Sequence, residues 1–494
     1  METRSVTVLS RILCGEVPRL VHVEVSFTPA TTMSCEVDTL SPEEADFYAR
    51  TARGAFLSCR YGLRVGHIKV AFRGAVPRPY HCFSLAVVTG LAVITEQIDP
   101  KCLEHYEFTG FVNIAGELQH GRGALLAIRA ASQDGRCSVV AERDWRRLSL
   151  IENAPMLVVR HIKELIEHLR GSIPRALNMI KAPSLPIIPP EKCAILNAHT
   201  GGFEEIALTT ACAGALTFKV QVPDDKTALD TAYSVANLLP NLDANTALEV
   251  AMRRDLAGWR DTEESWGRRI VVQLDCGEYL REPRRTAQDI GCVEAAHQGV
   301  LFVHAAPYTA EARGWLEAYT DLSEQRRNGT VPTQFQLVMA EPDCKCADQC
   351  KCIPHLSAEE CKALHRIRQR LSDIQIKYDP AFIPPIRTGL EFEQHVEQLR
   401  SRIAAAREIQ LSRAGKLNAQ LTDQEAEDLC ALTLPDEQIP PAARNRLREA
   451  QASPKIKRIA RTLADLDASD EIEESHKTMA TNLFVGFFLF FPKT

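Results

Sequence analysis

The sequence predicts mixed α/β structure followed by an all-helical region. Three short apolar runs, at residues 269–275, 298–303 and 335–339, are separated by helical patterns, as in a parallel sheet that is covered on both faces. An earlier run, residues 216–222, leads through a Pro-Asp-Asp break into a helix-like pattern. From about residue 386 to residue 478, apolar side chains repeat at the spacing of helices.

The composition is that of an ordinary globular protein, with 45% hydrophobic and 25% charged residues. The net charge of -6 excludes a basic surface over the whole protein, so any DNA contact would have to come from local patches. No apolar run approaches the roughly 18 residues of a membrane span, and the N-terminus is too polar for a secretory signal. We therefore expect no membrane partner.

Most of the 16 cysteines are scattered singly, which favours a reducing, cytoplasmic location.

Residues 1–170 alternate strand and helix patterns and form the first predicted domain. Short apolar runs predict strands at residues 6–12, 20–27 and 67–72. Ser41 is followed three residues later by Glu44, which is a capping box for a helix over residues 42–59. Residues 171–192 are rich in proline and show little periodicity, so they predict a linker.

Three further segments complete the predicted organisation. Residues 193–385 form an α/β core, because they contain the buried strands. Residues 386–480 form a helical C-terminal domain. The apolar tail, residues 481–494, is too short to cross a bilayer. It is typical of a docked or aggregation-prone terminus, with a membrane or partner anchor as the alternative.

Lys226 and Thr227 open the helix that follows the strand 216–222. A Lys-Thr pair in this position ends a phosphate-binding loop, in which the lysine reaches phosphate oxygens and the threonine hydroxyl holds Mg²⁺. The glycines of that loop are missing, because Val220 and Asp225 stand at their positions. The alternative is an ordinary strand–turn–helix that happens to carry Lys-Thr.

Seven stretches, spread over nearly the whole chain, carry further patterns. They are LEHYEFTGFVNIAGELQHGRGAL (103–125), LLPNLDANTALEVAMRRDLA (238–257), REPRRT (281–286), GVLFVHAAP (299–307), FQLVMAEPDCKC (335–346), REIQLSRAGKLNAQL (407–421) and IARTLADLDAS (459–469). Taken together and in this order, they resemble the magnesium-chelatase-like AAA+ family of the ComM type. The resemblance implies an N-terminal domain of the Lon-protease/ribosomal-S5 type, an AAA+ core with a P-loop and a helical C-terminal domain. It also implies hexameric rings that use ATP and Mg²⁺ and act on DNA in branch migration.

By the same resemblance, Lys226 and Thr227 are the nucleotide-binding residues. The remaining positions of the family's ATP site are altered here: its acidic pair falls on His304 and Ala305, its polar sensor on Glu341, its trans-acting arginine on Lys377 and its sensor arginine on Gln451. Phosphoryl transfer depends on positioning and charge stabilisation, and one arginine finger alone contributes about 10³–10⁵ in rate. We therefore expect a ComM-like protein whose ATP hydrolysis is lost, a pseudoenzyme. The alternatives are a non-catalytic scaffold or regulatory subunit, or a decaying copy without function.

Four cysteines form the pattern C-x-C-x₃-C-x-C, namely Cys344, Cys346, Cys350 and Cys352. Four thiolates this close in sequence can surround one tetrahedral Zn²⁺ ion, and four protein ligands make such a site structural. Adjacent disulfides or simple loop cysteines are the alternatives.

Basic residues gather in two places. Arg281, Arg284 and Arg285 are candidate DNA-binding residues. A second group lies along one predicted helix: Lys455, Lys457, Arg458 and Arg461. No aromatic side chains are interleaved for base stacking. The alternative for both groups is a solvated face with salt bridges.

Overall fold

The structure is a computed structural model that describes residues 3–14, 17–38, 40–73, 83–172, 184–185, 202–222, 225–259, 265–275, 292–304, 334–342, 359, 372–377, 390–430 and 453–485. The chain divides into two compact units. The first comprises residues 1–186, 243–267 and 286–290, and the second comprises residues 187–242, 268–285 and 291–494.

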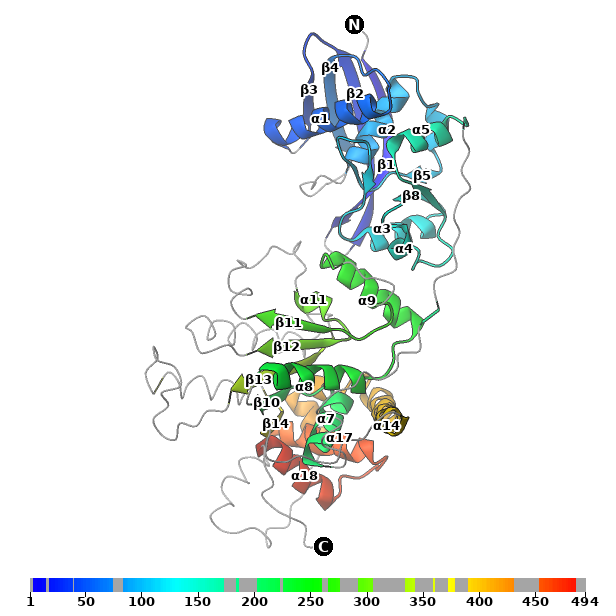
Figure 1. The fold of residues 1–494 in the computed structure, drawn as a ribbon. Coiled ribbons are helices and arrows are strands. Elements are labelled where there is room, and N and C mark those ends of the chain that lie inside the picture. The colour runs from blue at the N-terminus through cyan, green and yellow to red at the C-terminus, as the bar shows by residue number, and fades with distance from the viewer. Residues whose placement is uncertain are drawn as a thin grey trace. The chain divides into compact units, whose positions relative to one another are not determined.

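The first unit contains a four-stranded sheet with the order β1-β2-β4-β3 (Figure 1). Its strands are β1 (Arg4–Cys14), β2 (Val17–Pro29), β3 (Ser34–Val37) and β4 (Gly66–Arg73). In β2, alternate side chains from Val21 to Phe27 are buried, which is the period of a strand with one face in the core. Helices α1 (Pro42–Ser58) and α2 (Ser84–Ile94) pack against this sheet.

Helix α1 begins as the sequence predicts. The backbone N–H of Glu44 donates to Oγ of Ser41 at 3.3 Å, and the backbone N–H of Ser41 donates to Oε2 of Glu44 at 2.9 Å. These two bonds satisfy two of the N–H groups that a helix start leaves without partners. The capping box is therefore confirmed.

A second sheet of the first unit is parallel, with the order β5-β8-β9. The other elements of the unit are η1 (Pro100–Leu103), β5 (Tyr106–Glu107), β6 (Phe111–Val112), β7 (Leu118–Gln119), α3 (Ala124–Gln133), β8 (Cys137–Ala141), α4 (Trp145–Leu148), β9 (Met156–Val159), α5 (Ile162–Leu169) and α9 (Ala244–Leu256). Helix α9 packs against α3. The segment 243–267 thus belongs to the first unit, although sequence order groups it with the second predicted domain.

The second unit is built on a five-stranded parallel sheet with the order β11-β12-β13-β10-β14 (Figure 1). Its strands are β10 (Phe218–Val222), β11 (Val271–Asp275), β12 (Val300–His304), β13 (Gln336–Pro342) and β14 (Ile374–Lys377). Four successive residues from Val300 to Val303 are buried, as expected for a central strand that is covered on both faces. At Gly299 an added Cβ would lie 2.5 Å from the carbonyl oxygen of Ile270, so only glycine fits at the entry to β12.

Helices share one apolar core with this sheet. They are α7 (Phe203–Gly214), α8 (Asp225–Leu238), α14 (Leu390–Ala414), α17 (Pro454–Leu466) and α18 (Glu474–Val485). The shorter elements are α11 (Cys292–Ala295), η2 (Asn418–Gln420) and α15 (Asp423–Leu429). The prediction of mixed α/β structure with a parallel sheet and a helical C-terminal region is therefore confirmed.

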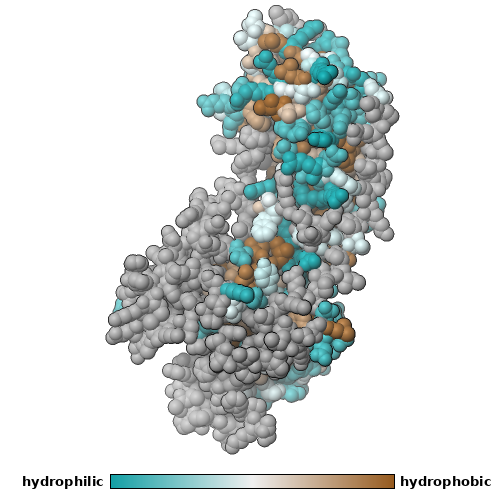
Figure 2. Space-filling view, viewed as in Figure 1, coloured by the Kyte–Doolittle hydropathy of each residue, from teal (hydrophilic) through white to brown (hydrophobic). Residues whose placement is uncertain are grey.

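Exposed large apolar side chains occur singly along the described chain, for example Val17, Leu57 and Leu390. On the face of the first unit that Figure 2 shows, hydrophobic residues are broken up by hydrophilic ones. Such scattered exposure is normal for a protein surface. In the described ranges, no helix combines the length and the hydrophobicity that a membrane crossing requires.

Candidate functional site

Lys226 and Thr227 lie in the first turn of α8, which begins three residues after the end of β10. Lys226 is exposed, whereas Thr227 is half-buried. The start of a helix presents N–H groups without intrahelical partners and a partial positive charge. The structure therefore puts this Lys-Thr pair at the carboxyl edge of the parallel sheet, where open α/β sheets bind their ligands.

The packing of α8 fixes the position of this helix start. Ala228, Ala232, Val235 and Leu238 follow one another at helical spacing, and all four are fully buried. On the same helix, the hydroxyl of Thr231 donates to the carbonyl oxygen of Thr227 at 2.9 Å. The spacing of apolar residues after the Lys-Thr pair thus predicts correctly which face of α8 enters the core.

The strand β12 ends at His304, which is in backbone register with Asp275 of β11 and Ala340 of β13. Neighbouring strands lie about 4.8 Å apart, so His304 is about 10 Å from β10 and Asp275 about 14 Å from it. Asp275 is an acid at this edge that the sequence reading did not single out. Its signal is visible in the sequence, because it is the last residue of the apolar run RIVVQLD.

Glu341 and Lys377 flank the end of β10 from opposite sides. Gln221 is in register with Glu341 of β13 and with Lys377 of β14. Each of these two positions is therefore one strand spacing, about 5 Å, from β10. The backbone brings four predicted positions to one edge of the sheet: Lys226, His304, Glu341 and Lys377.

The residues at this edge fit the phosphate part of a nucleotide better than its metal ion. Lys226 and the start of α8 supply positive charge for phosphate oxygens. Mg²⁺ requires hard oxygen ligands, yet the residue type at the end of β12 is histidine, His304. The acidic residues near this edge are instead at backbone positions of the flanking strands, Asp275 of β11 and Glu341 of β13.

Several predicted site residues lie outside the described residues. They are Ala305, Gln451, the candidate zinc ligands Cys344, Cys346, Cys350 and Cys352, and the DNA-binding candidates Arg281, Arg284 and Arg285. Within the residues that are described, no group of three or more His, Cys, Asp or Glu side chains is arranged to hold a metal ion. The zinc site and the arginine patch stay predictions.

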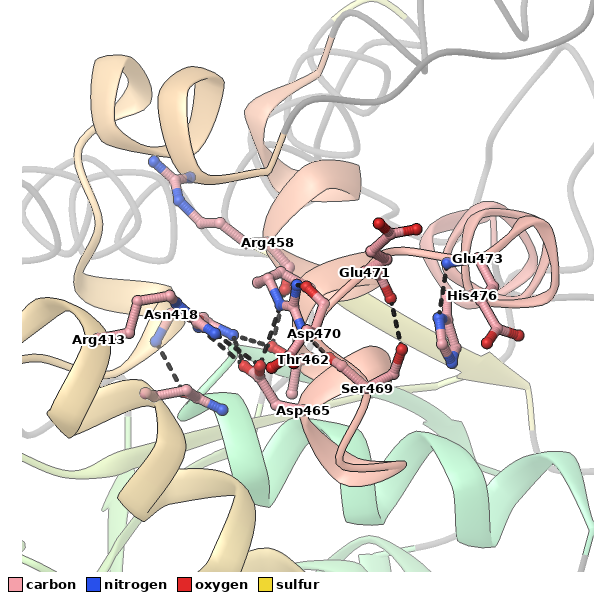
Figure 3. Close-up of polar contacts among 12 residues, drawn as sticks. Arg413, Asn418, Arg458, Thr462, Asp465, Ser469, Asp470, Glu471, Glu473 and His476 are labelled. Carbon is pink, nitrogen blue, oxygen red and sulfur yellow. Dashed lines mark hydrogen bonds and ion pairs between the residues drawn. The ribbon is translucent and has the colours of Figure 1, made fainter.

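The helical region contains a buried polar cluster around Asp465 of α17 (Figure 3). Arg413 donates to both carboxylate oxygens of Asp465, at 2.7 and 2.9 Å, and Nε of Arg461 donates to Oδ1 at 3.0 Å. Nδ2 of Asn418 donates to Oδ2 of Asp465 and to the hydroxyl of Thr462, both at 2.9 Å. The stretches 407–421 and 459–469 therefore meet around one fully buried carboxylate.

The basic residues of α17 are engaged inside the protein. Lys455 donates to the carbonyl oxygen of Ser372 at 2.7 Å, and Lys457 pairs with Glu427. Arg458 donates to the carbonyl oxygen of Leu421 and pairs with Asp423. Salt bridges and backbone contacts, the alternative to a phosphate-binding face, therefore describe this group.

A second buried polar cluster ties α9 into the first unit. Asp255 forms an ion pair with Arg147 and accepts a hydrogen bond from the backbone N–H of Leu125 at 2.9 Å. Burial raises the pKa of Asp255, while Arg147 opposes that effect. Nearby, Oδ2 of Asp144 accepts from the backbone N–H of His120 at 3.1 Å, and burial lowers the pKa of His120 to about 4.

Comparisons with known proteins match most of the chain. Residues 393–483 match the family model described as magnesium chelatase, subunit ChlI C-terminal. The competence protein ComM of Haemophilus influenzae is 24% identical over 499 residues, which cover 95% of each chain. An uncharacterized protein YifB of Escherichia coli is 24% identical over 491 residues, covering 93% of this chain and 92% of that protein. An uncharacterized protein of Mycobacterium tuberculosis is 25% identical over 363 residues, covering 70% of this chain and 69% of that protein.

Proposed function

Because the chain belongs to the magnesium-chelatase-like family of the ComM type, we propose that it is an AAA+-type ring subunit that has lost ATP hydrolysis. In this proposal, residues 1–170 form a Lon/S5-like N-terminal domain, residues 193–385 a degenerate AAA+ core and residues 386–480 the helical domain, although the segment 243–267 packs with the first unit. The parallel sheet of the second unit and the matched helical region support this organisation.

The observation that carries the proposal is the residue at the end of β12. By family resemblance, this strand end supplies the acidic pair that holds Mg²⁺ and polarises the attacking water, and here it carries His304. A neutral imidazole is a poor ligand for Mg²⁺. Asp275 lies one strand further from β10 than His304 does, about 14 Å away, so we propose that it does not replace the missing acid.

The residues on the strands next to β10 also support a loss of ATP hydrolysis. Glu341 stands in register with the end of β10, so it adds negative charge where phosphate oxygens would gather. Lys377 on the other side is a point charge without the bidentate fork of an arginine. When bound, Mg²⁺ would neutralise charge on the transferred phosphate. Lys226 and Thr227 can therefore contact a phosphate, but the acidic pair and the arginine that ATP hydrolysis also requires are replaced.

A second candidate is a non-catalytic scaffold or regulatory subunit, and the cluster around Asp465 favours it. The side chain of Asp465 is fully buried and receives donors from Arg413, Arg461 and Asn418. Nε of Arg413 is buried without a hydrogen-bond partner among the described residues, but the carboxylate itself is well supplied with donors. A buried polar network of this kind favours one arrangement of the helices, which an assembly role requires. Ring assembly, DNA contact and the zinc site are parts of the proposal that rest on family resemblance and on the sequence.

Equilibrium binding of ATP tests the proposed loss of the metal site. The full chain is titrated with ATP in the presence and absence of Mg²⁺, beside the variants Lys226→Ala and Thr227→Ala. We expect Mg²⁺ to leave any affinity for ATP unchanged, because β12 offers no acid to hold the ion. Tightening by Mg²⁺ of tenfold or more in the unmodified chain, and its loss in Thr227→Ala, would overturn the proposal.

A further inference from the structure

A small pocket opens at the amino edge of the parallel sheet in the second unit, at the opposite end of the strands from Lys226. It has an interior of about 50 Å³ and is lined by the residues that lead into β12 and β13, among them Gln298, Gly299 and Gln336, together with Arg407 of α14 and Gln420 of η2. The strand β12 has five residues, so the two edges of the sheet are about 16 Å apart. A phosphate held at Lys226 therefore does not reach this pocket.

Positive charge dominates the pocket. Two guanidinium groups line it, those of Arg269 and Arg407, and none of the described lining residues is an aspartate or glutamate. Nε of Arg269 donates to the carbonyl oxygen of Pro240 at 2.6 Å, and its Nη1 donates to the carbonyl oxygen of Gln298. Arg269 is thereby held in place by backbone oxygens.

Arg407 is half-buried. Both Nε and Nη2 of Arg407 donate to one acceptor, the carbonyl oxygen of Cys212, at 3.0 and 2.6 Å. Burial lowers the pKa of Arg407 to about 10, so the side chain stays charged at neutral pH. The described residues provide its guanidinium with a backbone oxygen and no carboxylate. Burying a charge without a counter-charge is costly, and an anion in the pocket would offset that cost.

Two donors on the pocket wall have no acceptor among the described residues. Nε and Nη2 of Arg407 make both of its bonds to Cys212, and the described residues offer its Nη1 no acceptor. Gln420 uses its Oε1 to accept from the backbone N–H of Leu417 at 2.9 Å, which leaves its Nε2 amide group as a donor. Gln336 also lines the pocket and is itself held, because its Nε2 donates to the carbonyl oxygen of Leu216.

The size of the pocket limits the ligand. One water molecule needs roughly 10–15 Å³ of such a space, so an interior of about 50 Å³ holds a group of a few heavy atoms. A tetrahedral oxyanion has that size, and a dianion matches the charge of two guanidinium groups. A whole nucleotide is too large.

We propose that this pocket is a binding site for a small tetrahedral oxyanion such as inorganic phosphate, held by Arg407 and Gln420 and distinct from the Lys226 edge of the sheet. Because it lies between the strand starts and the helices α14 and η2, the bound anion would link the helical C-terminal region to the sheet. This inference does not depend on whether the chain hydrolyses ATP.

The test is calorimetric titration of the full chain with inorganic phosphate in a chloride buffer of constant ionic strength. In Arg407→Met the apolar chain remains and the charge is removed. In Gln420→Glu the oxygen that caps Leu417 remains, and a carboxylate replaces the donor. We expect each variant to bind phosphate at least about tenfold more weakly, because charge-assisted hydrogen bonds and the net charge of the site are lost.

Two matched variants complete the test. Arg402→Met removes an exposed arginine of the same helix, one that pairs with Asp467, and it should leave phosphate affinity unchanged. Lys226→Ala should keep the phosphate-binding event that Arg407→Met and Gln420→Glu weaken, which separates this site from the proposed nucleotide site. The proposal is overturned if the unmodified chain binds no phosphate, if Gln420→Glu binds as well as the unmodified chain, or if Lys226→Ala is the variant that loses binding. If Arg407→Met does not fold, the phosphate affinity of Gln420→Glu decides whether the proposal holds.

Discussion

The carboxyl edge of the sheet and the polar cluster of the helical region differ in how completely their charges are matched. Around Asp465, a buried carboxylate receives donors from two arginines and an asparagine. At the sheet edge, the start of α8 and Lys226 follow β10, and β12, two strands away, ends in His304 rather than in an acid. Under the proposed function, the architecture of the chain is kept while the residues for ATP chemistry are not.

The two regions differ because the cluster around Asp465 is needed for folding, whereas the carboxyl edge of the sheet is needed for binding a ligand. A buried carboxylate without donors would destabilise the fold by several kcal/mol, so a change at Asp465 affects the whole domain. In open α/β sheets, ligands bind at the carboxyl ends of the strands, so we expect replacements at these positions to affect function more than folding. The following predictions test this division.

Asp465→Asn should give the largest effect on stability. It leaves Arg413 and Arg461 without their counter-charge in a buried place, and breaking a buried ion pair in this way costs about 3–5 kcal/mol. Urea denaturation followed by circular dichroism measures the loss. Asp467→Asn is the control, because the Asp467 side chain is 56% exposed. A loss below about 1 kcal/mol in Asp465→Asn would contradict a structural role for the cluster.

Arg147→Met should destabilise the first unit by a similar amount at pH 8, about 3–5 kcal/mol, because it leaves Asp255 buried and unpaired. Burial raises the pKa of Asp255 above its ordinary value, so the folded state binds a proton more tightly than the unfolded chain. Stability from this group is therefore present at low pH and is lost as pH rises. The cost of Arg147→Met should shrink when urea denaturation is repeated at pH 5.

A double variant sharpens this prediction. Arg147→Met combined with Asp255→Asn removes both charges and should recover part of the stability that Arg147→Met loses. Arg143→Met, which removes an exposed arginine, serves as the control. If the cost of Arg147→Met does not depend on pH, the ion pair is not what ties α9 to the first unit.

His120→Asn should change how stability depends on pH. Burial lowers the pKa of His120 to about 4, from an ordinary value near 6.5. Between these values the unfolded chain binds a proton that the folded protein does not, so stability falls as pH falls, by at most about 3 kcal/mol. Denaturation at pH 7.5 and pH 5 should show a smaller difference for the variant. An equal difference would mean that Asp144 compensates the positive charge on the protonated ring.

Ser41→Ala should give the smallest effect, a loss of about 1 kcal/mol, because it removes the hydroxyl that caps α1. The helix starts at an exposed position, so the remaining N–H groups are solvated in the variant. The midpoint of urea denaturation measures the change. A Ser41→Thr variant, which keeps a capping hydroxyl, should retain most of the stability. A loss above about 3 kcal/mol would show that Ser41 has a further role.

Local patterns predicted much of the fold. The capping box at Ser41 and the buried strands β11 to β13 are each visible within a few consecutive residues. The attachment of α9 to the first unit could not be predicted in this way. This attachment depends on the ion pair between Asp255 and Arg147, which are 108 residues apart in the sequence. Helical periodicity shows that α9 has an apolar face, but it does not show which element that face packs against.

The candidate site could likewise be predicted only as far as local sequence patterns reach. A Lys-Thr pair after a buried strand indicates the carboxyl edge of a sheet, and the order of the motifs suggested that His304, Glu341 and Lys377 lie near it. The strand order then determines which of these positions are neighbours, and it places Glu341 and Lys377 on either side of Gln221. The pocket at Arg407 brings together seven segments of the chain, so no single stretch of sequence indicates it.

The most direct test of the central claim is the turnover of ATP by the purified chain with Mg²⁺, with and without DNA, beside Lys226→Ala. The account predicts that phosphate release by the unmodified chain equals that of Lys226→Ala under both conditions, because the strand end at His304 supplies no acid. Turnover that Lys226→Ala abolishes would contradict it, and would show that this edge of the sheet is a working ATPase site.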